Sequence, residues 1–123
     1  EHGELILHIE IEPSKLSRRS HYLKVRDRAS YEFALASTAV ALDVEGDTIR
    51  AARIALGGVA TKPWRSREAE AALTGKPAAK ETFRAAADAA FANAKPRRDN
   101  AFKIELGKRT LVRALEEVWQ QHS

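Results

Sequence analysis

The sequence predicts an α+β domain in which helices cover one face of an antiparallel β-sheet. Three observations lead to this fold class. Apolar and polar residues alternate as in strands up to Val59, the apolar spacing changes to that of helices after Trp64, and the two kinds of segment are not interleaved. The chain has 123 residues, of which 44% are hydrophobic and 31% charged, so a single domain with one core accounts for it.

The first expected strand lies close to the N-terminus. Its apolar residues alternate with polar ones, as in a strand that buries one face: Leu5, Leu7, Ile9 and Ile11. Ile6 is the one apolar residue on the opposite, water-facing side. It is either covered by something other than water or a scattered surface residue, which is common. Pro13 and the polar residues 14–20 then interrupt the pattern.

Three further strands are expected between residues 22 and 59. In the second strand Leu23 and Val25 alternate with a polar face, on which neighbouring side chains are about 6.6 Å apart. Residues 33–44 are apolar on both alternating sets, which predicts an interior strand covered on both sides. Residues 49–59 match this strand, and Gly46 favours the turn between them, so the two predict an antiparallel hairpin.

Three helices are expected after the strands. The first begins after Ser66, which can cap it, and ends at Gly75. The second has apolar residues at positions i, i+3, i+4, i+7 and i+8 over residues 83–91. The third covers residues 102–119, and Gly107 weakens its middle by about 1 kcal/mol relative to alanine. Helices that follow strands in this way are expected to pack on one face of the sheet.

The sequence offers little catalytic chemistry. It contains no cysteine, and its four histidines lack the spacing of a metal site, so we predict neither a catalytic residue nor a bound metal. Nucleophile-elbow, Walker and dinucleotide motifs are absent as well. Gly57-Gly58 marks either a turn or bulge, or a place where the backbone approaches a ligand. No apolar run reaches about 18 residues, so membrane insertion is not expected.

Positive charge is concentrated in one short segment. The net charge of the chain is +4, whereas residues 15–28 hold six lysines and arginines against Asp27 alone. A basic protein can bind nucleic acid, but an excess confined to one segment fits a single local anion better, so we expect no nucleic-acid partner. The alternative is that the segment is simply a solvated charged face.

The most informative group of residues lies in and just after the second expected strand: Tyr22, Lys24, Arg26, Arg28 and Tyr31. Cations and aromatic rings in this arrangement suit a phosphate ester or an electron-rich ring system. A lysine near a reducible ring also stabilises the negative charge of its reduced form. Alternating cations are equally typical of a solvated edge strand that resists aggregation, and the residues alone do not decide between these interpretations.

Three segments, taken in order, carry a family resemblance: Gly3–Ile6 (GELI), His21–Ala34 (HYLKVRDRASYEFA) and Ala52–Arg65 (ARIALGGVATKPWR). Together they resemble the FAD subunit of molybdenum hydroxylases, the family of xanthine dehydrogenase, carbon monoxide dehydrogenase and bacterial aldehyde oxidoreductases, whose medium subunits look most similar. The resemblance implies a C-terminal α+β domain of three to four antiparallel strands with three helices packed on one face. Residues 1–20 would then be a strand and connector from a missing FAD-binding region, and residues 21–123 the C-terminal domain.

The resemblance also implies a function. The domain would close one side of the flavin site and help pass electrons from molybdenum and iron–sulfur subunits through FAD to an acceptor. Ile6 and Lys24 match positions that approach FAD in the family. The further candidates for covering the ring or its substrate side are Arg26, Arg28, Ser30 and Tyr31.

The family's glycine-rich loops for the FAD pyrophosphate have no match in this sequence, and neither have the cluster cysteines of some members. We therefore expect FAD in the full-length subunit only, with the isolated piece lacking FAD and inactive. Expected partners are the N-terminal FAD-binding domains of the same polypeptide and the molybdenum-cofactor and iron–sulfur subunits. Substrate, acceptor and compartment, bacterial cytoplasm or periplasm, stay open. The alternative is a docking or subunit-interaction module without cofactor contact.

Overall fold

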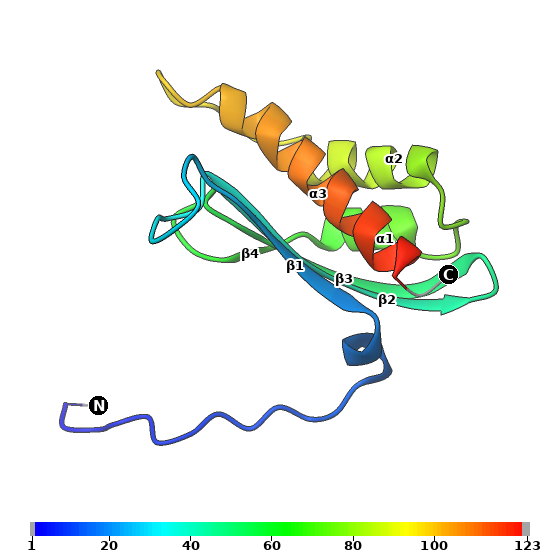
Figure 1. Ribbon diagram of the computed structural model, residues 1–123, viewed down its shortest axis with the longest axis horizontal. Helices are drawn as coiled ribbons and strands as arrows, with labels where there is room; N and C mark the ends of the chain where they lie inside the picture. The colour runs from blue at the N-terminus through cyan, green and yellow to red at the C-terminus, as the bar shows by residue number, and fades with distance from the viewer. Residues whose placement is uncertain (1, 122–123) are drawn as a thin grey trace.

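A four-stranded antiparallel sheet forms one layer of the computed structural model, and three helices form the other (Figure 1). The structure describes residues 2–121. Its strands follow chain order in the sheet: β1 (Ser20–Val25), β2 (Ala36–Glu45), β3 (Thr48–Gly57) and β4 (Trp64–Arg65). The short 3₁₀ helix η1 (Lys15–Arg18) precedes them, and the helices follow: α1 (Arg67–Leu73), α2 (Lys80–Phe91) and α3 (Phe102–Gln120). The predicted fold class is confirmed.

The predicted hairpin is the centre of the sheet. Strands β2 and β3 pair from Ser37 opposite Gly57 to Glu45 opposite Thr48, with one shift of register after Asp43. Gly46 closes the turn with a φ of +57°, which glycine adopts without strain. Strand β1 adds to the other edge of β2. The alternation in the sequence therefore gives one face that points to the helices and one that does not.

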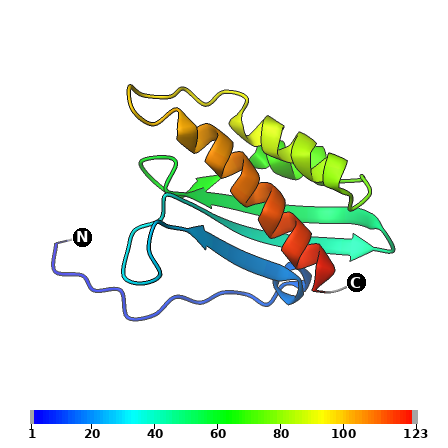
Figure 2. The ribbon, with the colours of Figure 1, turned by 45° about the horizontal axis from the view of Figure 1, so that its top comes forward.

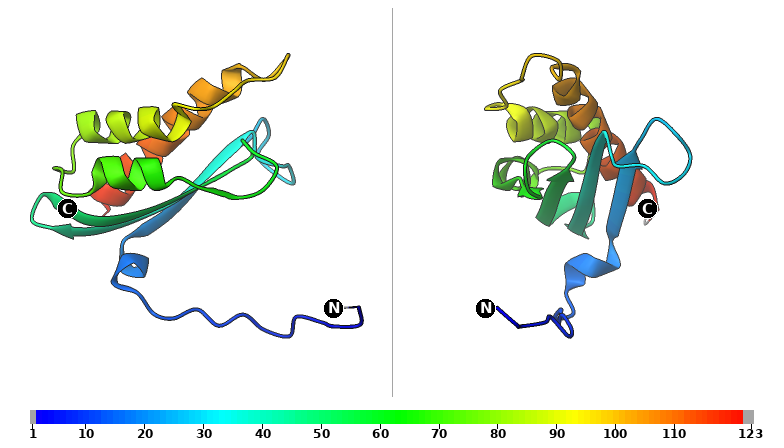
Figure 3. Two further views of the ribbon diagram at one scale, coloured as in Figure 1. Left: turned by 180° about the vertical axis from the view of Figure 1, so that it is seen from behind. Right: turned by 90° about the vertical axis from the view of Figure 1, so that its left-hand side faces the viewer.

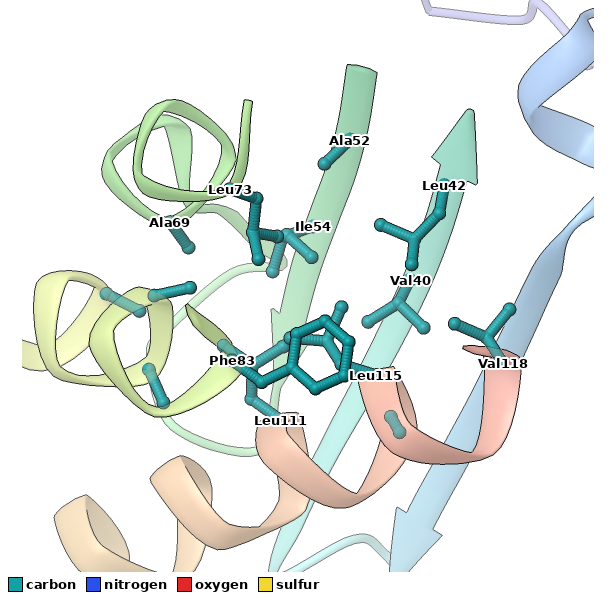
Figure 4. Packing of buried hydrophobic residues seen from close by; sticks show 14 of the residues in the cluster. Val40, Leu42, Ala52, Ile54, Ala69, Leu73, Phe83, Leu111, Leu115 and Val118 are labelled. Atoms are coloured by element: carbon teal, nitrogen blue, oxygen red, sulfur yellow. The ribbon is translucent and has the colours of Figure 1, made fainter. Parts of the chain in front are cut away.

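The core lies between the sheet and the helices. Val40 and Ile54 project from neighbouring strands toward Phe83 of α2 and Leu115 of α3 (Figure 4). All four side chains are at most 2% exposed. Helix α3 crosses the sheet diagonally and reaches β1 (Figure 2). None of the helices within residues 2–121 has both the length and the apolar character required to cross a bilayer.

Helices α2 and α3 approach each other closely at Gly107. A Cβ atom on this glycine would lie 2.4 Å from Cζ of Phe91, so any larger residue would force the Phe91 ring to move. Gly107 has a low helix propensity, but close packing against Phe91 accounts for its presence in the middle of α3.

The N-terminal strand predicted over residues 5–11 is not formed. Residues 4–14 make an extended tail that leaves on the side of the sheet away from the helices (Figures 1 and 3). The five apolar side chains of this tail are 79% to 87% exposed: Leu5, Ile6, Leu7, Ile9 and Ile11. A strand requires a neighbour for its backbone hydrogen bonds, and no other strand of the described structure lies beside the tail. Alternation alone therefore does not make residues 5–11 a strand in this structure.

The boundaries of strands β1 and β2 also differ from the prediction. Strand β1 stops at Val25, so Arg26 and Arg28 lie in the β1–β2 loop. Strand β2 starts at Ala36, and Phe33 is therefore in the loop and 95% exposed. Strand β2 is covered on one side only, because all three helices pack on the same face. Its outward residues are small, which made both faces look apolar in the sequence.

Candidate functional site

The uncovered side of the sheet, called the open face below, has a floor of small side chains. Strand pairing places these residues next to one another: Ser37, Ala39, Ala41, Ala51, Ala55 and Gly57. Tyr22 and Lys24 of β1 flank the floor on one side, and Arg65 of β4 flanks it on the other. Arg53 of β3 lies within the floor, opposite Ala41. Over these strands the surface forms a shallow hollow of about 450 Å³. A flat apolar floor between two cationic borders can receive either a planar group or another protein surface.

A second hollow, of about 440 Å³, lies at the β1–β2 loop and is called the aromatic hollow. It is lined by Lys24, Tyr31, Glu32 and Phe33. The rings of Tyr31 and Phe33 are 96% and 95% exposed, which is unusual for two large aromatic side chains so close together. The aromatic hollow thus combines two uncovered rings with one ammonium group.

The shape of the loop is fixed by hydrogen bonds within it. Nζ of Lys24 donates to the carbonyl oxygen of Glu32, and Nη2 of Arg28 donates to the carbonyl oxygen of Tyr31 at 2.9 Å. The backbone N–H of Arg28 donates to Oε2 of Glu32 at 3.0 Å. Leu35 N–H closes the loop on the carbonyl oxygen of Val25 at 2.9 Å. These bonds hold the lysine ammonium beside the rings.

Backbone strain points to the same loop. Tyr31 has a φ of +43°, and among residues 2–121 it is the one residue other than glycine with a positive φ. An aromatic residue rarely adopts this conformation, and such strain concentrates at ligand-binding and switch segments. The strained backbone presents the Tyr31 ring to the outside.

The structure brings some of the predicted residues together and separates others. Lys24 and Tyr31 line the same hollow. Arg28 braces the loop through its contacts, and Arg26 is exposed beyond the end of β1. Ile6 is 87% exposed and belongs to the N-terminal tail. This tail runs apart from the sheet (Figure 3). Two of the six predicted residues therefore share one site, and Ser30 is not among the residues that line it.

Sequence reasoning missed Phe33 and Glu32. Phe33 begins an apolar run that continues into β2, so its position outside the strand has no signal in the spacing. Glu32 acts through its backbone carbonyl, the acceptor for Lys24, and a backbone contact of this kind leaves no trace in the residue type.

A buried carboxylate, also missed, organises the opposite border of the open face. Glu70 of α1 accepts hydrogen bonds from Nε and Nη2 of Arg65, both at 2.9 Å, and from the N–H of Ile54 at 3.1 Å. Burial by itself would raise the pKa of Glu70. The hydrogen bonds from Arg65 and Ile54, together with the charges of Arg65 and Arg53, outweigh burial and lower that pKa. One feature of the sequence could have indicated an acidic partner here. Arg53 is a charged residue on the same face of β3 as the small residues Ala51 and Ala55.

The glycine pair serves the fold. Gly58 has a φ of +71°, and a Cβ there would lie 2.9 Å from the carbonyl oxygen of Ala34. The pair therefore allows the β3–β4 loop to approach the chain's own backbone. Of the two interpretations given above, this agrees with the turn rather than with a ligand contact. Within residues 2–121, no group of three or more histidine, aspartate or glutamate side chains is arranged to hold a metal ion.

Comparison with known proteins gives consistent matches. The family model described as CO dehydrogenase flavoprotein C-terminal domain matches residues 21–118. The chain is 44% identical over 119 residues to the aldehyde oxidoreductase FAD-binding subunit PaoB of Escherichia coli K12, covering 97% of this chain and 34% of that protein. It is 32% identical to the carbon monoxide dehydrogenase medium chain of Hydrogenophaga pseudoflava, covering 97% of this chain and 42% of that one. The chain thus spans well under half the length of these relatives.

Solved structures agree in fold. A carbon monoxide dehydrogenase from Hydrogenophaga pseudoflava that lacks the Mo-pyranopterin moiety of its molybdenum cofactor aligns with a TM-score of 0.77 at 35% identity, covering 85% of this chain and 37% of that one. Quinoline 2-oxidoreductase from Pseudomonas putida 86 aligns with a TM-score of 0.77 at 27% identity, covering 84% and 37%.

Proposed function

Because this chain belongs to the CO dehydrogenase flavoprotein C-terminal domain family, we propose that it closes one side of the flavin site in the FAD-containing subunit of a molybdenum-dependent oxidoreductase. The observation that carries the proposal is the aromatic hollow, where the ammonium of Lys24 lies beside the uncovered rings of Tyr31 and Phe33. The name of the 44% identical relative, an FAD-binding subunit, supports the choice of cofactor.

The residues of the aromatic hollow fit a planar ring system that can take up negative charge. FAD bound there would accept electrons that originate at the molybdenum and iron–sulfur subunits and release them to an external acceptor. Tyr31 and Phe33 offer ring faces that cover a planar group and exclude water from it. Lys24 supplies a fixed positive charge that stabilises the reduced, more negative form of such a ring. Its hydrogen bond to the Glu32 carbonyl holds that charge in place.

The remaining FAD contacts belong, in this proposal, to regions that precede the domain. The chain spans 34% of its relative PaoB, and the expected glycine-rich loops lie outside it. Residues 1–20 then act as a strand and connector that join those regions, with residues 21–123 as the domain itself. The exposed aliphatic side chains of the tail, Ile6 among them, are suited to such a neighbour. Ile6 meets FAD only if the preceding region returns the tail to the aromatic hollow.

The substitution Lys24→Ala in the full-length subunit tests the proposal. A charge-assisted contact contributes roughly 1.5–3 kcal/mol, so FAD retention should fall about ten- to hundredfold, or the flavin potential should become more negative. FAD content after gel filtration and spectroelectrochemical titration measure these two quantities. Lys76→Ala, at an exposed turn, is the matched control. Retention and potential both equal to those of the control would refute the role of Lys24.

The open face supports a second candidate, a docking module without cofactor contact. Its floor of small side chains and its cationic borders form an uncovered surface of the kind that a neighbouring domain packs against. Mixing this chain with a separately expressed N-terminal half of the subunit separates the two candidates. Yellow colour that is recovered and depends on Lys24 supports cofactor contact, whereas association that is insensitive to Lys24→Ala supports docking alone.

A further inference from the structure

A third hollow, the basic hollow, lies between the β3–β4 loop, the end of α2 and the start of α3. Its volume is about 540 Å³, within the range of small-molecule sites. Val59, Trp64 and Ile104 form apolar parts of its wall. The rim carries Lys95, Arg97 and Lys103. An apolar interior with a cationic rim is the lining expected for an organic anion.

The cations of the basic hollow are not balanced by carboxylates. Aspartate and glutamate are absent from its lining, in contrast to the hollow between α2 and α3, where acidic and basic residues alternate. There Lys80 pairs with Glu116 at 3.4 Å and Lys108 with Asp88 at 2.7 Å. Across residues 2–121, by comparison, neither Lys95, Arg97 nor Lys103 forms an ion pair with a carboxylate. Three uncompensated positive charges therefore border one concave space, where they attract an anion.

Contacts from several elements fix the shape of the basic hollow. Nζ of Lys103 donates to the carbonyl oxygen of Gly58 at 2.9 Å, which ties α3 to the β3–β4 loop and leaves two ammonium hydrogens for another acceptor. The N–H of Arg97 donates to Oδ1 of Asn100 at 2.6 Å and forms a local turn.

The aromatic wall is held just as firmly. The rings of Trp64 and Phe91 meet edge to face, with their centroids 5.8 Å apart. Gly107 leaves the room that Phe91 requires. The basic hollow is therefore formed before any ligand arrives, which reduces the entropy lost on binding.

We propose that the basic hollow binds a small organic anion with an apolar body. The anionic group, a carboxylate or a phosphate ester, lies against Lys95, Arg97 and Lys103, and the apolar body packs against Trp64. A concave space of this volume fits a small molecule better than a flat protein surface. The site shares no residue with the aromatic hollow, so it stands or falls independently of the proposed flavin contact.

Trp64 provides a built-in reporter for the test. The chain has two tryptophans, and Trp119 lies against Arg19 near the other end of α3, so a Trp119→Phe background isolates the signal of Trp64. The 123-residue chain is titrated with benzoate, adenosine monophosphate, inorganic phosphate and benzyl alcohol while fluorescence is recorded. We expect saturable quenching by benzoate or adenosine monophosphate at millimolar concentrations, weakened by added salt. Which of these two anions binds more tightly distinguishes the carboxylate from the phosphate ester.

Two substitutions complete the experiment. Arg97→Gln should weaken binding of the preferred anion about tenfold, as expected for the loss of one charge-assisted contact. Arg84→Gln, on an exposed position of α2 outside the basic hollow, should leave it unchanged. Each of the following outcomes would overturn the proposal: no saturable signal with either organic anion, equal binding of inorganic phosphate, or equal effects of the two substitutions. Saturable binding of benzyl alcohol as tight as that of benzoate would also overturn it, because charge would then play no part.

Discussion

Removing the carboxylate of Glu70 should destabilise the domain, because the backbone N–H of Ile54 loses its hydrogen-bond acceptor. Glu70 is 8% exposed and lies beside β3, just beyond the end of the short strand β4. At this point β4 no longer offers an acceptor to the backbone N–H of Ile54 in β3. Oε1 of Glu70 accepts that N–H at 3.1 Å. In Glu70→Ala the Ile54 amide loses its acceptor while the Ile54 side chain is 1% exposed.

The magnitude follows from what each partner can recover. A buried donor left without an acceptor costs about 1–3 kcal/mol. The guanidinium of Arg65 is 45% exposed and regains water, so the loss of its ion pair adds little. The substitution also removes the unfavourable burial of a charged carboxylate, which offsets part of this destabilisation. We expect a loss of about 2 kcal/mol, or roughly 1 M in the midpoint of urea unfolding. Glu70→Gln keeps an acceptor for Ile54 and should cost less.

Urea unfolding followed by circular dichroism measures these differences. Glu45→Ala is the matched control, because Glu45 pairs with Arg50 at the exposed β2–β3 turn and should lose less than about 1 kcal/mol. If Glu70→Ala and Glu45→Ala shift the midpoint equally, the Ile54 hydrogen bond is not the stabilising element. If Glu70→Gln costs as much as Glu70→Ala, charge rather than the amide bond is what matters.

Two further predictions concern packing and pH. Gly107→Ala should lower the melting temperature although alanine favours helices by about 1 kcal/mol, because its Cβ would lie 2.4 Å from Phe91 and overpacking costs about 1–3 kcal/mol. The double variant Gly107→Ala with Phe91→Leu should regain part of the lost melting temperature. A Gly107→Ala variant that is more stable than the original chain would contradict the packing argument. The hydrogen bond from Arg113 lowers the pKa of Glu117, and that of Glu70 is lowered too. The stability that these two carboxylates contribute is therefore fully present above about pH 4.5, the ordinary pKa of glutamate, and is lost as the pH drops through their lower folded pKa values. The difference between the urea midpoints at pH 7 and pH 3 measures this fall in stability. Glu70→Ala should make the difference smaller, and an identical difference in the variant would contradict a role for Glu70.

Much of the architecture was predictable because it depends on neighbours in sequence. The β2–β3 hairpin follows from alternation on either side of Gly46, and the helices follow from apolar spacing, the Ser66 cap and the position of Gly75. Such signals depend on backbone geometry over a few residues, so one sequence suffices to detect them. The same logic found Lys24 on an outward face of β1.

The predictions that were wrong depended on contacts between distant segments. The alternation of residues 5–11 indicates strand character, but a strand exists only beside a partner, and the described structure provides none. Alanines in β2 look buried in a sequence, and whether a layer covers them depends on where the helices lie. Phe33 was assigned to the strand and is in the loop instead.

Local periodicity and turn chemistry set the order of the elements, the hairpin and the outward direction of Lys24, so the order of amino acids was enough to infer them. Three features become visible only in the folded chain: Tyr31 and Phe33 line the same hollow as that lysine, Glu70 accepts the N–H at the edge of β3, and three cations line one hollow with apolar residues. These groups meet through loop closure and layer packing, which join residues far apart in the chain. Residue spacing holds no information on such distances until the fold is known.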